Sequence, residues 1–266
     1  MYDQFNRHIN YLRISVTDRC NLRCTYCMPE DGVTMLNHRD ILTFDEIVEF
    51  TRVATLIGVD KVRITGGEPL VRKGIVDLVG MLARIEGITD LAMTTNATLL
   101  KPFAKPLYDA GLKRVNISLD TLNPQKFSEV SRGGNIQDVI DGIMEAKAVG
   151  FNPIKINCVI KESSQEEDAQ EVRKFAFENG LQARFIPMMD LDKGLHGIVE
   201  GGEGGDCARC NRLRLTANGI VKPCLFSDIG YNVRELGARE AIINALKDKP
   251  ECGGISTTGE FYNVGG

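Results

Sequence analysis

LRISVTDRCNLRCTYC, residues 12–27, is the stretch that decides the fold. Its first six residues alternate between apolar and polar side chains, which indicates a β-strand with one buried face. Cys20, Cys24 and Cys27 then follow at spacings of four and three residues. Three thiolates can hold three irons of a 4Fe–4S cluster and leave the fourth iron open, or hold zinc together with water or a distant fourth ligand. The stretch therefore predicts a strand that leads into a metal site with one coordination position free.

The same strand-then-helix pattern is repeated along the chain as far as Met189. Strands are predicted at 12–17, 61–65, 91–95, 114–120, 153–160 and 182–188, and a helix-period stretch follows each of the first five. One predicted helix, at 44–57, begins after Thr43 with Glu46 three residues later, which is a capping-box pair. Alternating strands and helices predict parallel βα units joined by right-handed crossovers. We therefore predict an α/β fold, an incomplete (β/α)6 TIM-type barrel.

The parity of the strand residues places cations inside this barrel. Residues two apart in a strand share a face, so Arg13 lies on the face opposite Ile14. The same alternation gives a polar face that carries Lys61, Arg63, Lys155 and Arg184. The helices must cover the apolar face, and buried charge is costly without a partner. The interior is therefore expected to hold water and an anionic occupant, unless single side chains snorkel to the rim.

Composition places the chain among ordinary globular proteins. It has 266 residues, of which 43% are hydrophobic and 26% charged. A net charge of −4 gives no reason to expect nucleic acid as a partner. The first ten residues are polar and lack the apolar core of a secretion signal, and no segment approaches the roughly 20 apolar residues of a membrane span. We therefore predict a cytoplasmic protein that binds neither nucleic acid nor a membrane.

Six of the eight cysteines fall into two triplets, and the second is Cys207, Cys210 and Cys224. In a reducing compartment such clusters indicate metal or iron–sulfur ligands rather than disulfides. Cys158 lies in an apolar strand pattern and is predicted to be a small buried hydrophobic residue. Cys252 has no assigned role, and whether it completes the second set stays open.

A glycine-rich stretch before the second triplet suggests a division of the chain. Six glycines lie between Gly194 and Gly205, which is linker composition. We predict a partial barrel at 1–190, a linker at 191–206 and a small C-terminal iron–sulfur segment at 207–266 that closes the open barrel. His196, in the linker, is predicted to be a solvated loop residue.

The CxxxCxxC spacing, with Tyr26 before the last cysteine, resembles the signature of the radical S-adenosylmethionine (SAM) superfamily. TGGEP at 65–69 ends the second predicted strand. Its glycines allow close approach to the backbone, and Glu68 can accept hydrogen bonds from an ammonium group. The resemblance implies that Cys20, Cys24 and Cys27 hold a 4Fe–4S cluster with an open iron, and that Gly66, Gly67 and Glu68 bind the amino group of SAM.

A narrower resemblance rests on LRISVTDRCNLRCTYCMPEDG, KVRITGGEPL, RVNISLD, CARCNRLRLTANGIVKPCLF and the terminal Gly265-Gly266. Together they resemble the GTP 3′,8-cyclase (MoaA) family, which acts in molybdenum cofactor biosynthesis. The resemblance runs from about residue 12 to the last residue, apart from the glycine-rich stretch. It implies a lyase in which a 5′-deoxyadenosyl radical removes hydrogen from the 3′ carbon of GTP. That carbon then joins C8 of guanine to give 3′,8-cyclo-7,8-dihydro-GTP.

The resemblance also assigns roles to single residues. It implies that Cys207, Cys210 and Cys224 hold a second 4Fe–4S cluster whose open iron faces the guanine base. The SAM site is completed by Tyr26, Thr95, Ser118 and Arg184. Contacts with GTP fall to Arg13, Lys61, Arg63, Lys155, Arg212 and Arg214, and Arg184 is a candidate for these contacts as well. Gly265 and Gly266 are implied to reach into the active site, with a frayed chain end as the alternative.

Two departures from the family pattern keep alternatives open. The stretch before Cys207 and the region after Cys224 are short, and TNAT at 95–98 stands where the family has TNG. The shortened mouth favours a MoaA-like radical SAM enzyme that acts on a peptide or another small molecule. A non-catalytic metal-binding module is the more distant alternative. A reductant protein of the flavodoxin or ferredoxin type, hand-over of the product to the next molybdenum cofactor enzyme and a homodimer stay open.

Overall fold

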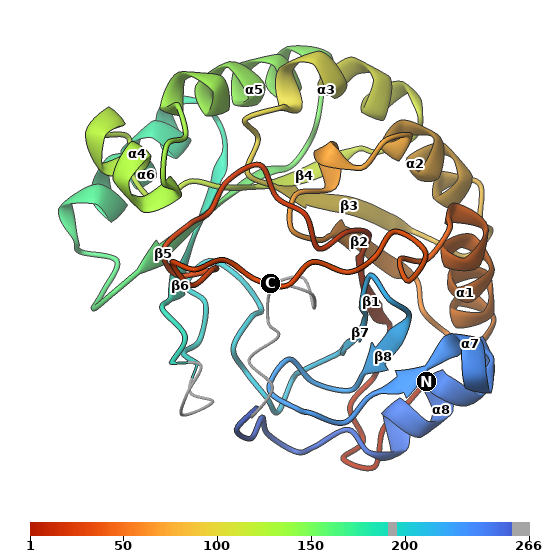
Figure 1. The fold of residues 1–266 in the computed structure, drawn as a ribbon. Coiled ribbons are helices and arrows are strands. Elements are labelled where there is room, and N and C mark those ends of the chain that lie inside the picture. The colour runs from red at the N-terminus through yellow and green to blue at the C-terminus, as the bar shows by residue number, and fades with distance from the viewer. Residues whose placement is uncertain (191–195, 257–266) are drawn as a thin grey trace.

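Five βα units and a sixth strand build the larger, N-terminal part of the chain (Figure 1). The computed structural model describes residues 1–190 and 196–256. The strands of these units are β1 (Tyr11–Ser15), β2 (Lys61–Thr65), β3 (Asp90–Thr95), β4 (Arg114–Ser118), β5 (Ile154–Ile160) and β6 (Gln182–Pro187). The helices are α1 (Phe44–Leu56), the 3-10 turn η1 (Pro69–Val71), α2 (Ile75–Ala83), α3 (Leu100–Asp109), α4 (Pro124–Ser131), α5 (Ile136–Val149) and α6 (Glu167–Glu178). The predicted strands are confirmed to within two residues at either end.

The nine strands found in the described residues form one sheet, in the order β6-β5-β4-β3-β2-β1-β7-β8-β9. The strands β1 to β6 are parallel neighbours in chain order, as consecutive βα units with right-handed crossovers require. The sheet curves so that its helices cover the outer side and its inner side stays open (Figure 1). The predicted fold class, an incomplete TIM-type barrel, is confirmed.

The C-terminal part adds β7 (Arg212–Leu215), β8 (Ile220–Lys222) and β9 (Tyr231–Asn232), followed by α7 (Val233–Leu236) and α8 (Ala238–Lys247). The strand β7 pairs in parallel with β1, so the second cysteine set begins beside a seventh parallel strand. On the other edge, Phe185 of β6 and Glu200 form an antiparallel bridge. The C-terminal part therefore contacts both edges of the open barrel. The proposed division at residues 190 and 206 stays a prediction.

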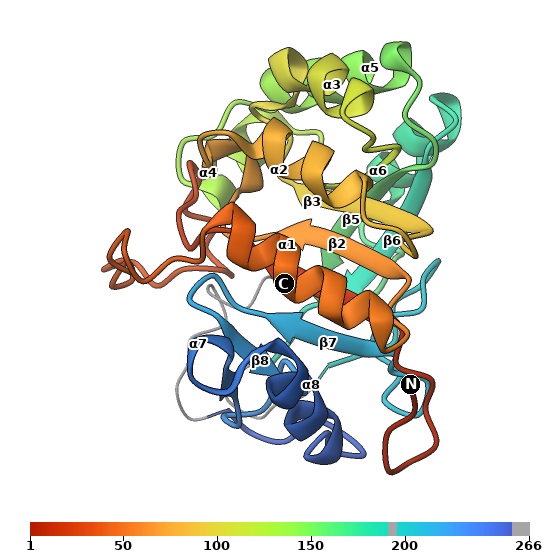
Figure 2. The same ribbon diagram turned by 90° about the vertical axis from the view of Figure 1, so that its right-hand side faces the viewer.

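The apolar face of the sheet packs under the helices. Leu12, Ile14, Val62 and Ile64 are at most 1% exposed, and each such burial contributes roughly 1.5–3 kcal/mol. The helix α1 begins at the predicted capping box, where Thr43 and Glu46 bond reciprocally through side chain and backbone. Figure 2 shows α8 beside α1 on the outer side. No helix in the described part of the chain is long and apolar enough to cross a bilayer.

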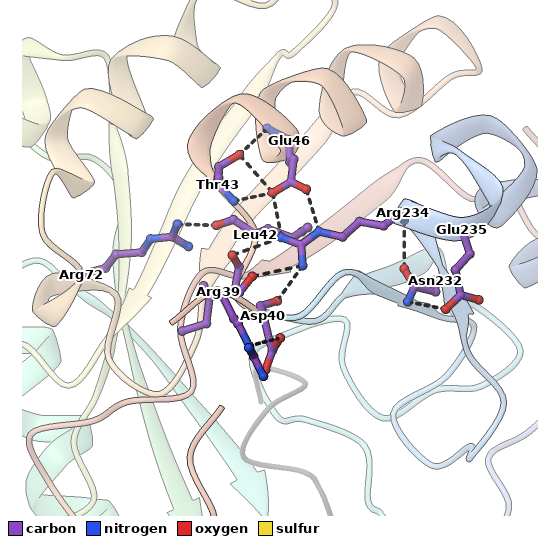
Figure 3. A network of polar contacts seen from close by, with 10 residues as sticks. Arg39, Asp40, Leu42, Thr43, Glu46, Arg72, Asn232, Arg234 and Glu235 are labelled. Carbon is purple, nitrogen blue, oxygen red and sulfur yellow. Dashed lines mark hydrogen bonds and ion pairs between the residues drawn. The ribbon is translucent and has the colours of Figure 1, made fainter. Parts of the chain in front are cut away.

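The loop between β1 and α1, which carries the first cysteine set, lies across the barrel mouth (Figure 1). Its far end is held by Arg234 of α7, whose Nε lies 2.7 Å from Oε1 of Glu46 (Figure 3). Nη1 of Arg234 also donates to the carbonyl of Asp40 at 3.2 Å, and Arg72 donates to the carbonyl of Leu42. The bond from Arg234 is the main reason why the pKa of Glu46 falls to about 2. Arg234 of α7 and Arg72 thus fix the end of the cysteine loop.

Candidate cofactor and substrate sites

The loop of the first cysteine set is positioned by hydrogen bonds from three sides. The amide of Cys27 donates to the carbonyl of Cys24 at 2.9 Å, which closes a turn between these two residues. Arg132, at the end of α4 with φ 54°, donates to the carbonyl of Met28 at 3.0 Å. Nδ2 of Asn96, after β3, lies 3.8 Å from Sγ of Cys20. The loop therefore depends on the ends of β3 and α4 as well as on β1.

The electrostatics of this loop fit a cationic metal centre. Burial and then the neighbouring thiols raise the pKa of Cys24 to about 12. Burial and then Cys20 raise the pKa of Cys27 to about 11. Three thiolates close together repel one another and need positive charge to stay ionised, and an iron–sulfur cluster or a zinc ion supplies it. The donor set thus fits a three-thiolate metal site, as the sequence predicts.

The TGGE segment after β2 is held against the cysteine loop by its backbone. The amide of Gly67 donates to the carbonyl of Thr17 at 2.8 Å, and that of Glu68 donates to the carbonyl of Arg19 at 2.8 Å. A Cβ on Gly66 would lie 2.7 Å from the oxygen of Thr17, and one on Gly67 would lie 2.3 Å from the oxygen of Arg19. The glycines therefore allow the cysteine loop to pack closely against this backbone. From the sequence alone, they are instead expected to make room for a ligand.

Glu68 itself is buried, at 1% exposure. Its carboxylate accepts from the hydroxyl of Thr95 at 2.7 Å and from the amides of Asn96 at 2.7 Å and Leu70 at 3.1 Å. Burial raises its pKa to about 7 in spite of these bonds. A cation beside this carboxylate would favour the ionised form. The site therefore suits the ammonium group that the resemblance assigns to it.

TNAT, the departure after β3, has a conformational consequence. Ala97 adopts φ 61°, in the left-handed region where glycine is favoured. Its amide donates to the hydroxyl of Thr95 at 2.9 Å, and its side chain is fully buried. The turn that glycine would form without strain is therefore kept here with alanine.

A small cavity joins the cysteine loop to the carboxyl end of β4. Among its lining residues are Cys24 and Tyr26 of the loop, Asn96 after β3, and Ser118 and Asp120. The hydroxyl of Tyr26 donates to Oδ2 of Asp120 at 2.7 Å. Burial and then this carboxylate raise the pKa of Tyr26 far above its usual value. Two residues that we predict for the SAM site, Tyr26 and Ser118, are thus brought together, while Thr95 contacts Glu68 instead.

A row of arginines crosses the inner face of the sheet at one register level. Arg13 of β1 lies opposite Arg63 of β2 and opposite Arg214 of β7. Arg63 lies opposite Ala92 of β3, which in turn lies opposite Arg114 of β4. Neighbouring strands are about 4.8 Å apart, so the four guanidinium-bearing residues occupy neighbouring positions with a single interruption.

The remaining predicted cations share this face. Tyr11 lies opposite both Lys61 and Arg212, Asn116 lies opposite Lys155, and Asn157 lies opposite Arg184. The structure therefore places on one face the basic residues that parity assigns to the interior together with the two that the resemblance adds as GTP contacts: Arg13, Lys61, Arg63, Lys155, Arg184, Arg212 and Arg214.

Sequence reasoning missed two members of this face. Arg114 has the parity of the inner face but was not assigned to the site, and its guanidinium lies 2.8 Å from Asp90. Tyr11 precedes the predicted start of the first strand. The guanidinium of Arg63 lies 5.2 Å and that of Arg212 5.7 Å from the centre of the Tyr11 ring, within cation–π distance. Starting the strand one residue earlier would have included this tyrosine.

The cations of the inner face depress one another's pKa values. Burial is the first cause in each case, followed by neighbouring cations. The pKa of Lys155 falls to about 8 and that of Arg214 to about 10. The pKa values of Arg13, Arg63 and Arg184 are also lowered. Such mutual repulsion indicates that an anion belongs in the interior.

Unused hydrogen-bond donors point the same way. Within residues 1–190 and 196–256, the buried Nε atoms of Arg114, Arg184 and Arg212 have no acceptor. Buried N–H groups without partners are rare in folded proteins, and each costs roughly 1–3 kcal/mol. An anionic ligand with several oxygens, such as a polyphosphate, would satisfy both the donors and the charge.

The second cysteine set lies at the entrance to β7. The amide of Cys210 donates to the carbonyl of Cys207 at 3.2 Å. Burial raises the pKa of Cys210, but the charges of Lys249 and Arg212 and the hydrogen bonds from both residues together outweigh it and lower the pKa. Sγ of Cys252 is only 2.7 Å from Sγ of Cys207. The cation and the clustered thiols fit a metal centre here too.

The expectation that His196 is a solvated loop residue is wrong. Its ring stacks on Phe226, with the ring centres 5.2 Å apart, and its Nε2 lies 3.5 Å from Sγ of Cys207. The contact spans the glycine-rich stretch, so local composition could not reveal it. Gly265 and Gly266, which we assigned to the active site, lie outside the described residues.

Known proteins resemble this chain in sequence and in fold. The model of the radical SAM superfamily matches residues 14–176. The GTP 3′,8-cyclase of Thermodesulfovibrio yellowstonii is 42% identical over 305 residues, covering 94% of this chain and 95% of that protein. The enzyme of the same name from Peptoclostridium acidaminophilum is 40% identical over 299 residues and covers 94% and 92%. These alignments exceed the 266 residues of the chain, so the relatives contain segments that it lacks.

Solved structures agree on the fold. SuiB from Streptococcus suis bound to S-adenosylmethionine gives a TM-score of 0.70 at 19% identity, covering 93% of this chain and 66% of SuiB. Native anSMEcpe with bound AdoMet gives 0.51 at 18% identity, over 68% and 52%. Identities this low establish the fold alone. The family model and the sequence relatives show the family: this chain is a shortened member of the GTP 3′,8-cyclase family of radical SAM enzymes.

Proposed function

We propose that this protein cyclises GTP to 3′,8-cyclo-7,8-dihydro-GTP in molybdenum cofactor biosynthesis. The observation that carries the proposal is the arginine row, which lies on the inner face of the barrel below the cysteine loop. The relatives named above are GTP 3′,8-cyclases, and their alignments with this chain cover nearly their whole length. A triphosphate is the part of GTP that such a row would recognise.

The first cysteine set serves the radical chemistry. As a member of the radical SAM superfamily, the protein uses S-adenosylmethionine together with an iron–sulfur cluster. A 4Fe–4S cluster at Cys20, Cys24 and Cys27 would supply the electron that cleaves SAM into methionine and a 5′-deoxyadenosyl radical. Glu68 would accept hydrogen bonds from the ammonium group of SAM. The Gly66-Gly67 backbone keeps this carboxylate beside the cysteine loop through the bond from Gly67 to Thr17.

The basic face would hold the substrate. Arg13 and Arg63 occupy the middle of the arginine row and are our first choices for the triphosphate. The amide of Asn116, with its oxygen turned toward Arg63, accepts from Nε at 3.1 Å and from an Nη at 3.2 Å, which fixes the guanidinium. Fixing the triphosphate in this way would hold the ribose near the radical, an effect of orientation.

The second cysteine set and the partners complete the proposal. Cys207, Cys210 and Cys224 would hold a second 4Fe–4S cluster at the entrance to β7, next to Arg212 and Arg214. A reductant of the flavodoxin or ferredoxin type, hand-over of the product, a homodimer and a cytoplasmic location stay predictions.

The test is an anaerobic incubation of reconstituted protein with SAM, a reductant and GTP, followed by mass spectrometry. We expect 5′-deoxyadenosine and a nucleotide isomeric with GTP to form together, because one radical is used for each cyclisation. Omitting GTP or replacing it with ATP is the control and should remove the isomeric product. Cleavage of SAM while GTP survives would leave the radical chemistry standing and refute GTP as the substrate, which would favour the peptide or small-molecule alternative.

The pH dependence of GTP binding should report the charge of Lys155. In the free protein its pKa is about 8, so it loses its proton above that pH. A bound triphosphate favours the charged form, so the complex holds more protons than the free protein and affinity falls as pH rises through 8. Between pH 7 and 9 we expect the dissociation constant of GTP to rise about tenfold through this residue.

The measurement is titration calorimetry across that range, with Lys155→Arg as the matched control. Arginine stays charged throughout, so its curve should be nearly flat once the titration of GTP itself, which both proteins share, is subtracted. Parallel curves for the two proteins would show that Lys155 does not face the triphosphate.

A further inference from the structure

The basic face divides into two groups of cations, with Arg63 between them. The β7 group comprises Arg13, Arg212 and Arg214, and the β4 group comprises Arg114, Lys155 and Arg184. The guanidinium of Arg63 lies 5.2 Å from the centre of the Tyr11 ring, and that of Arg212 lies 5.7 Å from the same ring. On the other side, Arg63 donates from Nε at 3.1 Å and from Nη2 at 3.2 Å to the amide oxygen of Asn116 on β4, with that oxygen turned toward it. Arg63 therefore connects the surroundings of the two groups.

Arg114 is the member of the β4 group that follows Arg63 along the arginine row. Ala92 of β3 lies opposite Arg63 on one side and opposite Arg114 on the other. Its side chain is a single methyl group, so no large side chain at this level of β3 separates the two arginines. Lys155 of β5 lies opposite Asn116, which is two residues after Arg114 and therefore on the same face.

The cations of the β4 group act on one another and on Arg63. Burial is the first cause that lowers the pKa values of Arg63, Lys155 and Arg184, and the charge of Arg114 is a further cause in all three. The pKa of Arg13 falls through burial and then through the charge of Arg214, which belongs to the β7 group. Arg114 is therefore the cation whose charge reaches every other member of the β4 group.

The β4 group keeps positive charge and hydrogen-bond donors in excess. Oδ2 of Asp90, at the start of β3, lies 2.8 Å from Nη2 of Arg114, and the charge of Glu203 acts on Arg184. Two carboxylates are outnumbered by the three cations of the group together with Arg63. The buried Nε atoms of Arg114 and Arg184 have no acceptor within the part of the chain that the structure describes. An anion with several oxygens would supply both the charge and the acceptors.

The proposed function gives the nucleotide a direction on this face. Guanine is assigned to the second cysteine set, and Cys210 lies two residues before Arg212, at the entrance to β7. From β7 the sheet continues through β1, β2 and β3 to β4. A nucleotide with its base at β7 therefore extends its phosphates past Arg13 and Arg63 toward β4. The last phosphate is the one that reaches the β4 group.

We propose that Arg114 recognises the terminal phosphate of the nucleotide and thereby makes the site prefer a nucleoside triphosphate to a diphosphate. The inference rests on the proposed function and deepens it. Arg13 and Arg63 would contact the inner phosphates, which GTP and GDP share, whereas Arg114 would contact the phosphate that only GTP carries. Asp90 holds the guanidinium of Arg114 through Nη2 and leaves Nε for a phosphate oxygen.

Equilibrium dialysis of GTP and of GDP against the reconstituted protein, without SAM or reductant, tests this role. We expect the unaltered protein to bind GTP at least about tenfold more tightly than GDP. In Arg114→Met the affinity for GTP should fall about 10- to 100-fold, as expected for the loss of a hydrogen bond between charged groups. The affinity for GDP should change by no more than about threefold, within the spread of a removed surface charge. Equal losses for the two nucleotides, or an unchanged affinity for GTP, would refute the proposal.

The matched control is Lys113→Met, which removes a positive charge one residue earlier. The side chain of Lys113 is exposed, and its Nζ donates to the carbonyl of Tyr108 at 2.9 Å. The ratio of the GTP and GDP affinities should stay at the value of the unaltered protein. A ratio that falls as far in Lys113→Met as in Arg114→Met would show that the net charge of the protein, and not Arg114, sets the preference.

A double variant separates the role of Arg114 from that of its partner, because Arg114→Met leaves the carboxylate of Asp90 without the guanidinium. In Asp90→Asn/Arg114→Met this carboxylate is gone, so any loss of thermal stability caused by it should be recovered. We expect the ratio of the GTP and GDP affinities to stay low in the double variant. A ratio restored to the value of the unaltered protein would assign the effect to repulsion by Asp90 and refute the role of Arg114.

These outcomes separate this inference from the proposed function. If the unaltered protein cyclises GTP and the ratio of affinities is unchanged in Arg114→Met, only the role of Arg114 fails. If the unaltered protein binds neither nucleotide, the substrate of the proposed function fails and this inference fails with it.

Discussion

Replacing Cys24 with serine is expected to abolish the formation of 5′-deoxyadenosine from SAM. Cys24 is the middle cysteine of the first set, and its carbonyl accepts from the amides of both Cys27 and Met28, so it lies at the centre of the loop. A serine hydroxyl stays protonated at neutral pH and is a poor ligand for iron, so the cluster should be lost rather than weakened. Iron content should fall from about eight to about four per chain.

The matched control for this variant is Cys158→Ala. Cys158 is 1% exposed in β5, on the apolar face under the helices, and is far from either cysteine set in sequence. Its loss should cost about 1 kcal/mol of stability and leave iron content and SAM cleavage intact. The assay is chromatographic measurement of 5′-deoxyadenosine under anaerobic conditions with reductant. Unchanged formation in Cys24→Ser would overturn the assignment of the first cluster.

The barrel could be predicted because each of its units is encoded locally. Alternation marks the strand at Arg13, and the capping box of Thr43 and Glu46 marks the start of α1. The parity that places Arg13 and Arg63 on one face depends only on residues two apart. Such features need no knowledge of which strands become neighbours.

Which strands pair with one another could not be predicted from local sequence in the same way. β7 follows a glycine-rich stretch and precedes no helix of the βα pattern, so nothing local indicates that it pairs with β1. The alignment of Arg214 with Arg13 is a consequence of that pairing. The parity of residues within each strand was enough to predict a basic face. Predicting the arginine row would also have required the register between five strands.

The second cysteine set shows the same limit more strongly. Cys252 lies 45 residues from Cys207, and Arg7, which joins the two segments, lies 200 residues away from Cys207. His196 sits in a stretch whose composition favours a linker. Contacts of this kind are made by tertiary packing alone, so the sequence could point only to Cys207, Cys210 and Cys224, which the family resemblance covers.

Replacing Arg212 with alanine is expected to impair cyclisation far more than uncoupled SAM cleavage. Arg212 begins β7 directly after the second cysteine set, and it lies opposite Tyr11 on the inner face. One Nη donates to the carbonyl of Glu203 at 3.1 Å, while the buried Nε has no acceptor within the described residues. That free donor is available to a ligand, and the side chain is remote from the loop that would hold SAM.

The expected loss of activity in Arg212→Ala follows from the loss of a hydrogen bond between two charged groups. A hydrogen bond to a charged group contributes about 1.5–3 kcal/mol, so kcat/KM for GTP should fall about 10- to 100-fold. Folding should not suffer, because the charge of Arg212 is one of the causes that lower the pKa values of Arg13 and Arg214, and its removal relieves that repulsion. The variant should therefore keep its thermal midpoint and its rate of 5′-deoxyadenosine formation without GTP.

The control is Arg209→Ala, in the same segment but with an exposed side chain, which should change neither rate. Both products are measured in one reaction, so the ratio of cyclised nucleotide to 5′-deoxyadenosine is independent of the amount of active protein. We expect this ratio to fall in Arg212→Ala and to stay constant in Arg209→Ala. Equal losses of the two products in Arg212→Ala would mean that the arginine supports the radical site or the fold, and that the basic face does not hold GTP through it.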